Sequence, residues 1–411
     1  MISRRKFLGL TGSAAAAAMA GPGQILTAAP KSESELGKVK ITDVKTTAIK
    51  IKKWKNHLIK VETDSGLYGL GEAYPKAEIV DDIKDIKGKI IGKDPLHVEV
   101  LYQLLADSYV SRGSRTGSLA GAISGIESAL WDLAGKILNV PTYVLLGGKY
   151  RDKMLIYHDA ESPKTSDPSA WVDTARFSLD YGFKAIKLSL PRYDGEKWNR
   201  DLSYGNLKKW VDILEAVRDD IGPDVPLAAD FHWKYNTSDM LQFAKMVEHI
   251  HLWFIEDPIR VENADSFVRL TAECNVPIAT GENLYSREGF RPFIEKQACD
   301  LIHPDAQKCG GLLETKRIAD WADLYNMNMI CHNGSTPVGT TASAHACAAI
   351  KSFIALESDA VTIPYWQDII LRDGPFYEDG YIAVSEKPGI GVELNEEVCK
   401  AHLGDNRGFF Q

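Results

Sequence analysis

Short apolar runs alternate with amphipathic stretches from residue 153 onward. Each apolar run ends on an ionisable residue, and an amphipathic helical stretch follows it. The interval between these residues, roughly 25 positions after Asp230, is the length of a strand, a helix and two loops. The runs end at His158, Lys187, Asp230, Glu256, Glu282, Asp305, His332 and Glu357. Eight such units predict an α/β barrel of the TIM type, with its chemistry at the carboxyl ends of the strands.

The chain on either side of this repeat has a different pattern. Residues 38–152 contain two strand-like runs joined by turns, and then a helix with apolar residues at helical spacing, "GSLAGAISGIESALWDLAGKIL". They predict a separate α+β domain, followed by a barrel over residues 153–360. Residues 361–411 have strand and turn signals without the repeat, and we expect them to pack back on the first domain.

The interval between Lys187 and Asp230 is longer than the others. The additional chain, "LPRYDGEKWNRDLSYGN", directly follows the second barrel strand. We expect it on the active face, where it would help to shape a substrate pocket; the alternative is a loop that only decorates the surface.

The first residues have the architecture of a signal peptide. "SRRKFLGLTGSAAAAAMA" begins with basic residues and continues with a mild apolar run and small residues. Arg4 and Arg5 suit the twin-arginine class, which predicts a leader over residues 1–29 and a periplasmic location. The alternative is a disordered tail with chance arginines. The apolar run is too short and too rich in alanine for a membrane span.

Composition narrows the class of partner. Hydrophobic content of 45% and charged content of 25% over 411 residues are typical of a soluble globular protein. The net charge of −8 argues against a nucleic-acid partner, because phosphates require a basic surface. The six cysteines form no Cys-x-x-Cys pair and are interpreted as small buried apolar residues.

Three of the strand-end residues predict a metal site. Asp230, Glu256 and Glu282 close successive strands, and neighbouring strands lie only ~4.8 Å apart. Three carboxylates at that spacing repel one another unless a cation lies between them. An all-oxygen set favours a hard divalent ion, and Mg²⁺ is the expected cofactor. The alternative is that each acid caps a helix or pairs with a lysine.

Several longer motifs carry a family resemblance, which covers nearly all of the chain after about residue 40. The motifs are "IESALWDLAGK", "VPTYVLLGGKYRDK", "WFIEDPI", "TGENLYSREGF", "HPDAQKCGGLLETKRIA" and "PGIGVEL". They resemble those of the enolase superfamily, in its mandelate racemase/muconate lactonizing branch. The resemblance implies a (β/α)₇β modified TIM barrel under an N-terminal capping domain, Mg²⁺ on the three acids, and removal of a proton α to a carboxylate.

A base for that proton is expected on neighbouring strands. A carboxylate such as Asp305, bonded to one nitrogen of His332, would orient the ring and raise its pKa. The resemblance assigns these two residues as the family's His–Asp dyad. His303 is a rival, although Pro304 disturbs the strand there.

The second barrel strand departs from the racemases of the family. They carry Lys-x-Lys, whereas this chain has Lys187 and then Ser189, which is a poor base at neutral pH. One good base favours β-elimination or ring opening over racemisation. Lys187 is expected to hold a substrate oxygen or to stabilise the developing charge; the alternative is a lysine that only satisfies a neighbouring acid.

The stretch "PLAADFHWKY" supplies the expected acid. If its strand continues through Trp233, Asp230 and His232 point to the same side. His232 would then protonate a leaving hydroxyl, and the sugar-acid dehydratases of the branch are similar at this position. The alternative is an imidazole that only hydrogen-bonds the substrate. Glu357 resembles the family's acid that contacts the substrate carboxylate.

These patterns together predict an exported, Mg²⁺-dependent hydro-lyase that converts a sugar acid to a 2-keto-3-deoxy acid. Three other functions stay open: a cycloisomerase of a sugar-acid lactone or anhydro ring, a racemase or epimerase, and a non-catalytic periplasmic binder. The expected partner is a small acid sugar, with no nucleic acid and no membrane span, and the chain is expected to form a homo-oligomer.

Overall fold

The computed structural model describes residues 38–190, 202–372 and 374–411. The predicted leader at residues 1–29 lies outside the described residues. Residues 191–201, which form most of the additional loop after the second barrel strand, lie outside them as well.

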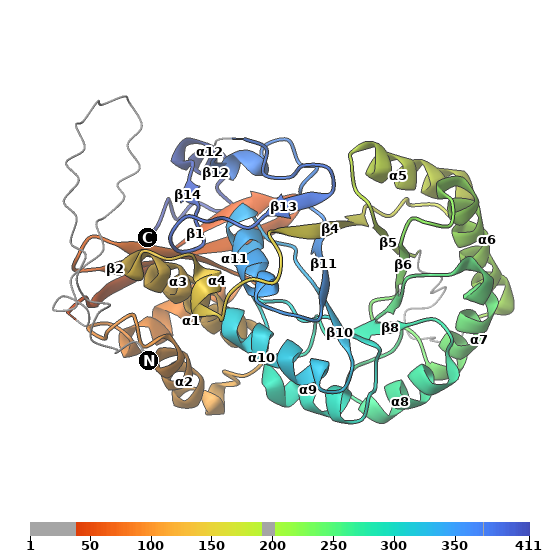
Figure 1. Ribbon diagram of the computed structural model, residues 1–411, viewed down its shortest axis with the longest axis horizontal. Helices are drawn as coiled ribbons and strands as arrows, with labels where there is room; N and C mark the ends of the chain where they lie inside the picture. The colour runs from red at the N-terminus through yellow and green to blue at the C-terminus, as the bar shows by residue number, and fades with distance from the viewer. Residues whose placement is uncertain (1–37, 191–201, 373) are drawn as a thin grey trace, which may run out of the picture.

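The first part of the described chain is a three-stranded antiparallel sheet covered by helices, which we call the cap (Figure 1). Helix α3 packs directly on strand β3, and glycines allow the close approach. A Cβ atom at Gly71 would lie only 2.3 Å from the carbonyl oxygen of Gly125. The elements are β1 (Ile41–Ile51), β2 (Trp54–Thr63), β3 (Tyr68–Ala73), α1 (Ile79–Ile86), η1 (Lys87–Lys89), α2 (Val98–Ser108), η2 (Val110–Arg112), α3 (Gly117–Leu138) and α4 (Thr142–Leu145).

Eight parallel strands form the barrel, and pairing between β11 and β4 closes it. They are the eight apolar runs of the sequence: β4 (Lys153–Ala160), β5 (Ile186–Ser189), β6 (Leu227–Asp230), β7 (Ile255–Glu256), β8 (Ile278–Thr280), β9 (Leu301–Ile302), β10 (Asn328–Cys331) and β11 (Phe353–Ser358).

A helix follows each of the first seven barrel strands. In the described residues after β11, this alternation of strand and helix does not continue. The helices form the outer ring seen in Figure 1. They are α5 (Pro168–Asp180), α6 (Tyr204–Ile221), α7 (Thr237–Val247) with η3 (Glu248–Ile250), α8 (Ala264–Glu273), α9 (Ser286–Glu295), α10 (Leu312–Asp323) and α11 (Pro337–Ala348). The prediction of a (β/α)₇β barrel with an N-terminal cap is confirmed.

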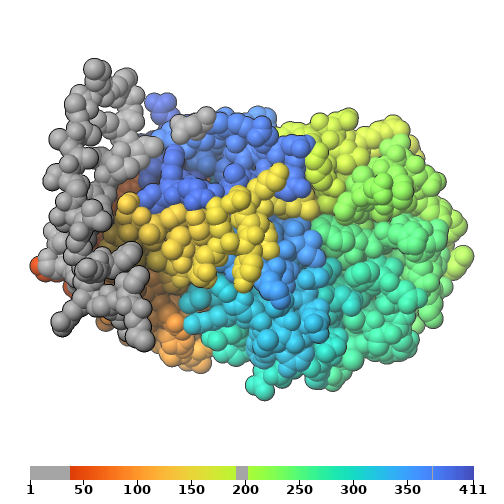
Figure 2. All heavy atoms as spheres, in the orientation of Figure 1, coloured from red at the N-terminus to blue at the C-terminus, as the bar shows by residue number. Residues whose placement is uncertain are grey.

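The C-terminal segment contacts both parts. Strand β13 pairs antiparallel with β4 of the barrel. The last residues run along β1 of the cap, where the amide of Gly404 donates to the carbonyl of Ala48 at 2.7 Å. Figure 2 shows this segment, in blue, beside the yellow end of the cap and the yellow-green start of the barrel. Its elements are η4 (Gln367–Ile369), β12 (Ile370–Leu371), β13 (Tyr381–Ala383), β14 (Glu393–Leu394) and α12 (Glu396–Ala401).

Buried carboxylates join the cap to the barrel. Glu72 of β3 accepts hydrogen bonds from the backbone amides of Thr336 and Gly339, both at 2.9 Å, at the start of α11. Glu127 of α3 accepts from the amide of Leu312 at 2.7 Å, at the start of α10. Each acid therefore satisfies free amides at a helix N-terminus, where the helix dipole also favours a negative charge.

Two further expectations concern the chain as a whole. Within the ranges that the structure describes, no helix is both long and apolar enough to cross a bilayer. The six cysteines are free thiols, and all but Cys274 are buried, as their apolar neighbours in the sequence predicted.

Candidate active site

Lys187 of β5 lies at the centre of the barrel mouth with 1% of its surface exposed. Its Nζ is 2.8 Å from Oε2 of Glu256 and 2.9 Å from Oε1 of Glu357. Asp159 and Asp230 each place an oxygen 3.9 Å away. Burial alone would lower the pKa of Lys187, but the charges of Asp159, Glu256 and Glu357 raise it well above its ordinary value. The lysine is therefore a fixed cation among acids.

His332 and Asp305 form the pair that the sequence predicted. Nδ1 of His332 lies 2.6 Å from Oδ2 of Asp305, and Nε2 lies 2.6 Å from Oε2 of Glu282. Burial opposes protonation of the ring, yet the charges of Glu282 and Glu357 raise the pKa of His332 well above 6.5. The same contact lowers the pKa of Glu282 well below its ordinary value, against the opposite effect of burial.

His232 reaches Asp230 by a route that the sequence did not predict. Strand β6 ends at Asp230, and both His232 and Trp233 have left-handed φ angles of 49° and 57°. The expectation that the strand continues through Trp233 is therefore wrong. The tight bend returns the ring to the carboxylate, so that Nδ1 of His232 lies 2.9 Å from Oδ2 of Asp230.

The pKa values of His232 and Asp230 reflect this contact. Burial opposes the charged imidazole, but Asp230 raises the pKa of His232 to about 9. Burial likewise opposes the carboxylate, while His232 and Lys187 lower the pKa of Asp230. His232 thus holds a proton at neutral pH in this arrangement.

Two groups of three residues, which share Glu256, bring possible metal-ligand atoms close together. In the first, ligand atoms of Glu256, Asp257 and Glu282 all lie within 4.8 Å of one another. Asp230 is not a member of either group; Lys187 and His232 connect it to the site instead. Asp257 was missed by sequence reasoning, because its only signal is its position next to Glu256. It is buried with φ of 43°, and Thr280 donates a hydrogen bond to it at 2.5 Å.

The chemistry of this donor set suits a hard divalent cation. Every ligand atom in the first group is a carboxylate oxygen, as Mg²⁺ prefers. Both oxygens of Glu256 are buried, and neither accepts a hydrogen bond from any described residue. Buried oxygens of this kind are costly unless a cation neutralises them. Lys187 supplies one positive charge, which is fewer than the negative charges of the carboxylates around it. A metal ion would neutralise the remaining ones.

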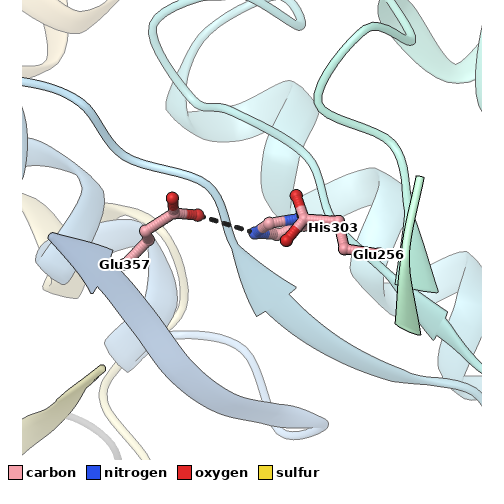
Figure 3. Close-up of side chains that lie close together, drawn as sticks. All are labelled: Glu256, His303 and Glu357. Atoms are coloured by element: carbon pink, nitrogen blue, oxygen red, sulfur yellow. Dashed lines mark ion pairs between the residues drawn. The ribbon is translucent and has the colours of Figure 1, made fainter. Parts of the chain in front are cut away.

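The second group consists of Glu256, His303 and Glu357, whose ligand atoms also lie within 4.8 Å (Figure 3). His303 is not the partner of Asp305, as the rival prediction would require; its ring lies between the two glutamates. Tyr157 of β4 donates to Oε2 of Glu357 at 2.7 Å and lies 2.8 Å from Nε2 of His303. Tyr157 is another site residue that the sequence analysis missed.

The first barrel strand shows why Tyr157 was missed. His158, the strand-end residue named from the sequence, points away from the site, where its ring stacks on Phe183 at 4.4 Å and contacts Ser178. Successive strand residues face opposite sides, so Tyr157 and Asp159 point inward instead. Burial is the main cause that raises the pKa of Asp159 to about 7.

The cap contributes to the mouth of the barrel through Tyr74, which follows β3. Its ring lies 6.0 Å from the ring of His332, and Nζ of Lys308 lies 4.4 Å from the centre of the Tyr74 ring. Lys308 is buried and donates to Oδ1 of Asn283 at 2.6 Å. An aromatic face and a cation therefore flank the histidine on the side of the cap.

Comparison with known proteins shows the family of the chain. Residues 37–147 match the family model described as "Mandelate racemase / muconate lactonizing enzyme, N-terminal domain", and residues 170–398 match "Enolase C-terminal domain-like". The chain belongs to the enolase superfamily, in its mandelate racemase/muconate lactonizing branch.

The relatives of this superfamily member include D-xylonate dehydratase of Haloferax volcanii, 37% identical over 374 residues, or 90% of each chain. D-galactonate dehydratase of Cronobacter sakazakii is 30% identical over 82% of this chain and 88% of its own. The chain is thus an enzyme, a carbon–oxygen lyase by its likeness to these dehydratases.

Two solved structures of the superfamily extend the likeness. A mandelate racemase/muconate lactonizing enzyme-like protein from Rubrobacter xylanophilus has a TM-score of 0.87 and 36% identity, with 90% of this chain and 99% of that chain covered. The 3,6-anhydro-D-galactonate cycloisomerase from Zobellia galactanivorans has a TM-score of 0.79 and 28% identity, with 89% and 100% covered.

Proposed function

We propose that this enolase-superfamily enzyme dehydrates a sugar acid, either an aldonate or a uronate-derived acid, to a 2-keto-3-deoxy acid. One observation carries the proposal: two imidazoles, of His232 and His332, contact two different members of the set of strand-end acids, Asp230 and Glu282. A base and a separate acid beside one group of carboxylates suit removal of a proton and loss of a hydroxyl from adjacent carbons. The dehydratases among the relatives support the same reaction.

Asp230, Glu256 and Glu282 are proposed to hold Mg²⁺. Asp230 and Glu256 end β6 and β7, and Glu282 lies two residues after β8; the three strands are neighbours in the barrel. When bound, Mg²⁺ supplies positive charge beside the substrate carboxylate and so makes the α-proton more acidic. Asp257, which the structure groups with Glu256 and Glu282, is the competing candidate for the place of Asp230.

His332 is proposed to take the α-proton through Nε2. Asp305 accepts from Nδ1 and fixes the ring's direction. Glu282, 2.6 Å from Nε2, favours a proton there, and Mg²⁺ on Glu282 would reduce that effect so that Nε2 could act as the base. In this arrangement Nε2 points to the carboxylate of Glu282 and so to the group of acids.

His232 is proposed to give a proton to the leaving hydroxyl. While no metal shares its carboxylate, Asp230 raises the pKa of His232 to about 9; Mg²⁺ on Asp230 would reduce this effect, so that the ring could release its proton. Lys187 and Glu357 are proposed to face the substrate carboxylate as a pair, since Nζ and Oε1 lie 2.9 Å apart and neutralise each other there.

A screen of acid sugars tests the proposal directly. The purified protein with Mg²⁺ is incubated with a panel of aldonates and uronate-derived acids, and products are analysed by mass and by a carbonyl reagent. We expect loss of one water and appearance of a 2-keto acid for at least one member. A panel that returns only unchanged acids, with the protein folded and Mg²⁺ present, contradicts the proposal.

Cycloisomerisation is the second candidate, and the likeness to the 3,6-anhydro-D-galactonate cycloisomerase favours it. The same screen separates the two, because isomerisation leaves the mass unchanged whereas dehydration removes water. A racemase or epimerase would instead place deuterium from D₂O at the α-carbon of both epimers.

We further propose export to the periplasm by the twin-arginine route, on the evidence of Arg4 and Arg5. Cell fractionation of the full chain and of an R4K/R5K variant tests this proposal. The wild type is expected in the periplasmic fraction and the variant in the cytoplasm; equal distributions would contradict export by this route. Native mass of the exported protein tests the expected homo-oligomer.

A further inference from the structure

His303 is fully buried at the carboxyl end of β9, and the proposed reaction assigns it no step. Its Nδ1 lies 2.9 Å from Oε1 of Glu256, and its Nε2 lies 3.2 Å from Oε2 of Glu357. Tyr157 lies 2.8 Å from the same Nε2. Figure 3 shows the ring between the two glutamates. Both nitrogens thus face carboxylate oxygens, which is the environment of a ring with a proton on each nitrogen.

The spacing of Glu256, His303 and Glu357 would also suit a metal ion. However, Nζ of Lys187 lies 2.8 Å from Oε2 of Glu256 and 2.9 Å from Oε1 of Glu357. An ammonium group therefore already occupies the cationic position between the two acids. A metal ion in that same position, between Glu256 and Glu357, would lie against the ammonium group and be strongly repelled. Residues of the chain itself therefore neutralise the negative charges of Glu256 and Glu357 in this group.

The positions of His303 and Glu357 in the barrel allow them to restrain the carboxylate of Glu256. Strands β7 and β11 lie four places apart in the eight-strand ring, so Glu256 and Glu357 face each other across it. His303 spans the interval, and Tyr157 anchors its far nitrogen to β4. The Glu256 carboxylate is contacted on Oε1 by His303 and on Oε2 by Lys187, yet neither oxygen accepts an aligned hydrogen bond. The two contacts thus fix the direction of the carboxylate, while its oxygens keep lone pairs that a metal could use.

We propose that His303 is a positioning residue for the magnesium site. It fixes the carboxylate of Glu256, the middle of the three proposed ligands, by connecting it across the barrel to Glu357 and Tyr157. This inference rests on the proposed function for the presence of Mg²⁺, and it assigns His303 to affinity for the metal rather than to the chemical step. Groups that orient a metal ligand from outside the coordination sphere typically contribute a factor of about 10–100 in affinity.

Metal titration tests the inference without any substrate. The dissociation constants of Mg²⁺ and Mn²⁺ are measured by calorimetry for the wild type, His303→Leu, His303→Gln and His158→Asn. His158 is the matched control, because it is another buried histidine of the barrel and faces away from the site. We expect affinity to fall roughly 10–100-fold for His303→Leu, less for His303→Gln, and not at all for His158→Asn. One ion per chain is the expected stoichiometry.

The outcomes separate this inference from the proposed function. Wild-type affinity in both folded His303 variants overturns the role of His303, and two ions per chain overturn the argument from Lys187. Thermal melts without metal show which variants fold; if His303→Leu does not, His303→Gln decides. Absence of metal binding by the wild type overturns the magnesium site and this inference together. Failure of the acid-sugar screen alone, with His303-dependent metal affinity, contradicts only the proposed dehydration.

Discussion

Nδ1 of His332 lies 2.6 Å from Oδ2 of Asp305, although the two residues follow different barrel strands. The contact fixes the direction of the ring and turns Nε2 toward the strand-end acids, where it lies 2.6 Å from Oε2 of Glu282. His332→Asn is therefore expected to lower kcat by roughly 10²–10⁴-fold or more, with the metal affinity kept. Asp305→Asn is expected to lower kcat less, since the base stays but loses its orientation. Steady-state rates and metal titration of both variants check this expectation; equal loss of metal affinity would point to a structural role.

His232→Asn is expected to separate two events at the active site. Removal of the acid should slow loss of the hydroxyl by roughly 10²–10⁴-fold. Removal of the α-proton by His332 should continue, so deuterium from D₂O should enter the recovered substrate. Mass spectrometry of substrate and product measures both. His249→Asn is the control, because His249 is exposed and its Nε2 lies 2.8 Å from Glu215 on the surface. Parallel loss of exchange and dehydration would exclude His232 as the acid.

Asp230 and Asp257 compete for one place among the metal ligands. Asp257 is buried in the group with Glu256 and Glu282, and burial and then their charges raise its pKa well above 3.8. Thr280 already donates a hydrogen bond to Oδ1 of Asp257, so Asp230→Asn is expected to weaken Mg²⁺ binding by at least tenfold and Asp257→Asn by much less. Calorimetric titration decides between them, and the reverse order would transfer the ligand role to Asp257. Chelation of the wild type should abolish activity, and Mg²⁺ should restore it.

Stability is expected to fall as the pH drops from about 6.5 to about 4, in part because of His345. Its Nδ1 accepts from the amide of Tyr143 at 3.2 Å, and Nε2 contacts the carbonyl of Ile390 at 3.1 Å. Burial lowers the pKa of His345 to about 4. In the unfolded chain the histidine is protonated near pH 6.5. The free energy of unfolding therefore decreases by up to roughly 3 kcal/mol as the pH falls through this interval.

Denaturant unfolding at a series of pH values measures this contribution. His345→Leu should be less stable at pH 7, because two hydrogen bonds are lost, but its stability should decline less steeply between pH 6.5 and 4. His249→Asn should keep the wild-type slope. An unchanged slope in His345→Leu would show that the pH dependence arises elsewhere.

Glu72→Gln is expected to loosen the cap on the barrel. The amide group of glutamine would set a donor against the backbone amides of Thr336 and Gly339, which now donate to Glu72. The expected loss of unfolding free energy is about 1–3 kcal/mol. Chemical denaturation measures it, and hydrogen exchange of the amides at the start of α11 should accelerate. Exposed Glu397→Gln is the control; equal stability of the two variants would contradict the structural role of Glu72.

The barrel and the positions of its strand ends could be predicted from the sequence because the signal is local. A short apolar run that ends on Asp230, Glu256 or His332 specifies both the strand and the residue at its carboxyl end. The pairing of His332 with Asp305 could be predicted because their strands are neighbours and because the family resemblance assigns the two residues as a dyad.

The remaining site residues depend on features that a linear pattern does not contain. Tyr157 faces the site in place of His158, because the register of β4 decides which of the two points inward. The bend at His232 needs two left-handed residues that are not glycine, which no local preference predicts. The position of His303 between two glutamates follows from contacts across the barrel rather than along the chain.

The acids that join α3 and β3 to the barrel helices restrict how the enzyme can admit its substrate. If the two parts moved apart as rigid bodies, Glu72 and Glu127 would each be stripped of the amides that now satisfy them. We therefore expect substrate to enter and product to leave when short segments at the rim rearrange, such as the one that carries Tyr74. Any motion that limits the rate of turnover would then involve a few residues at the rim and not the movement of a whole domain.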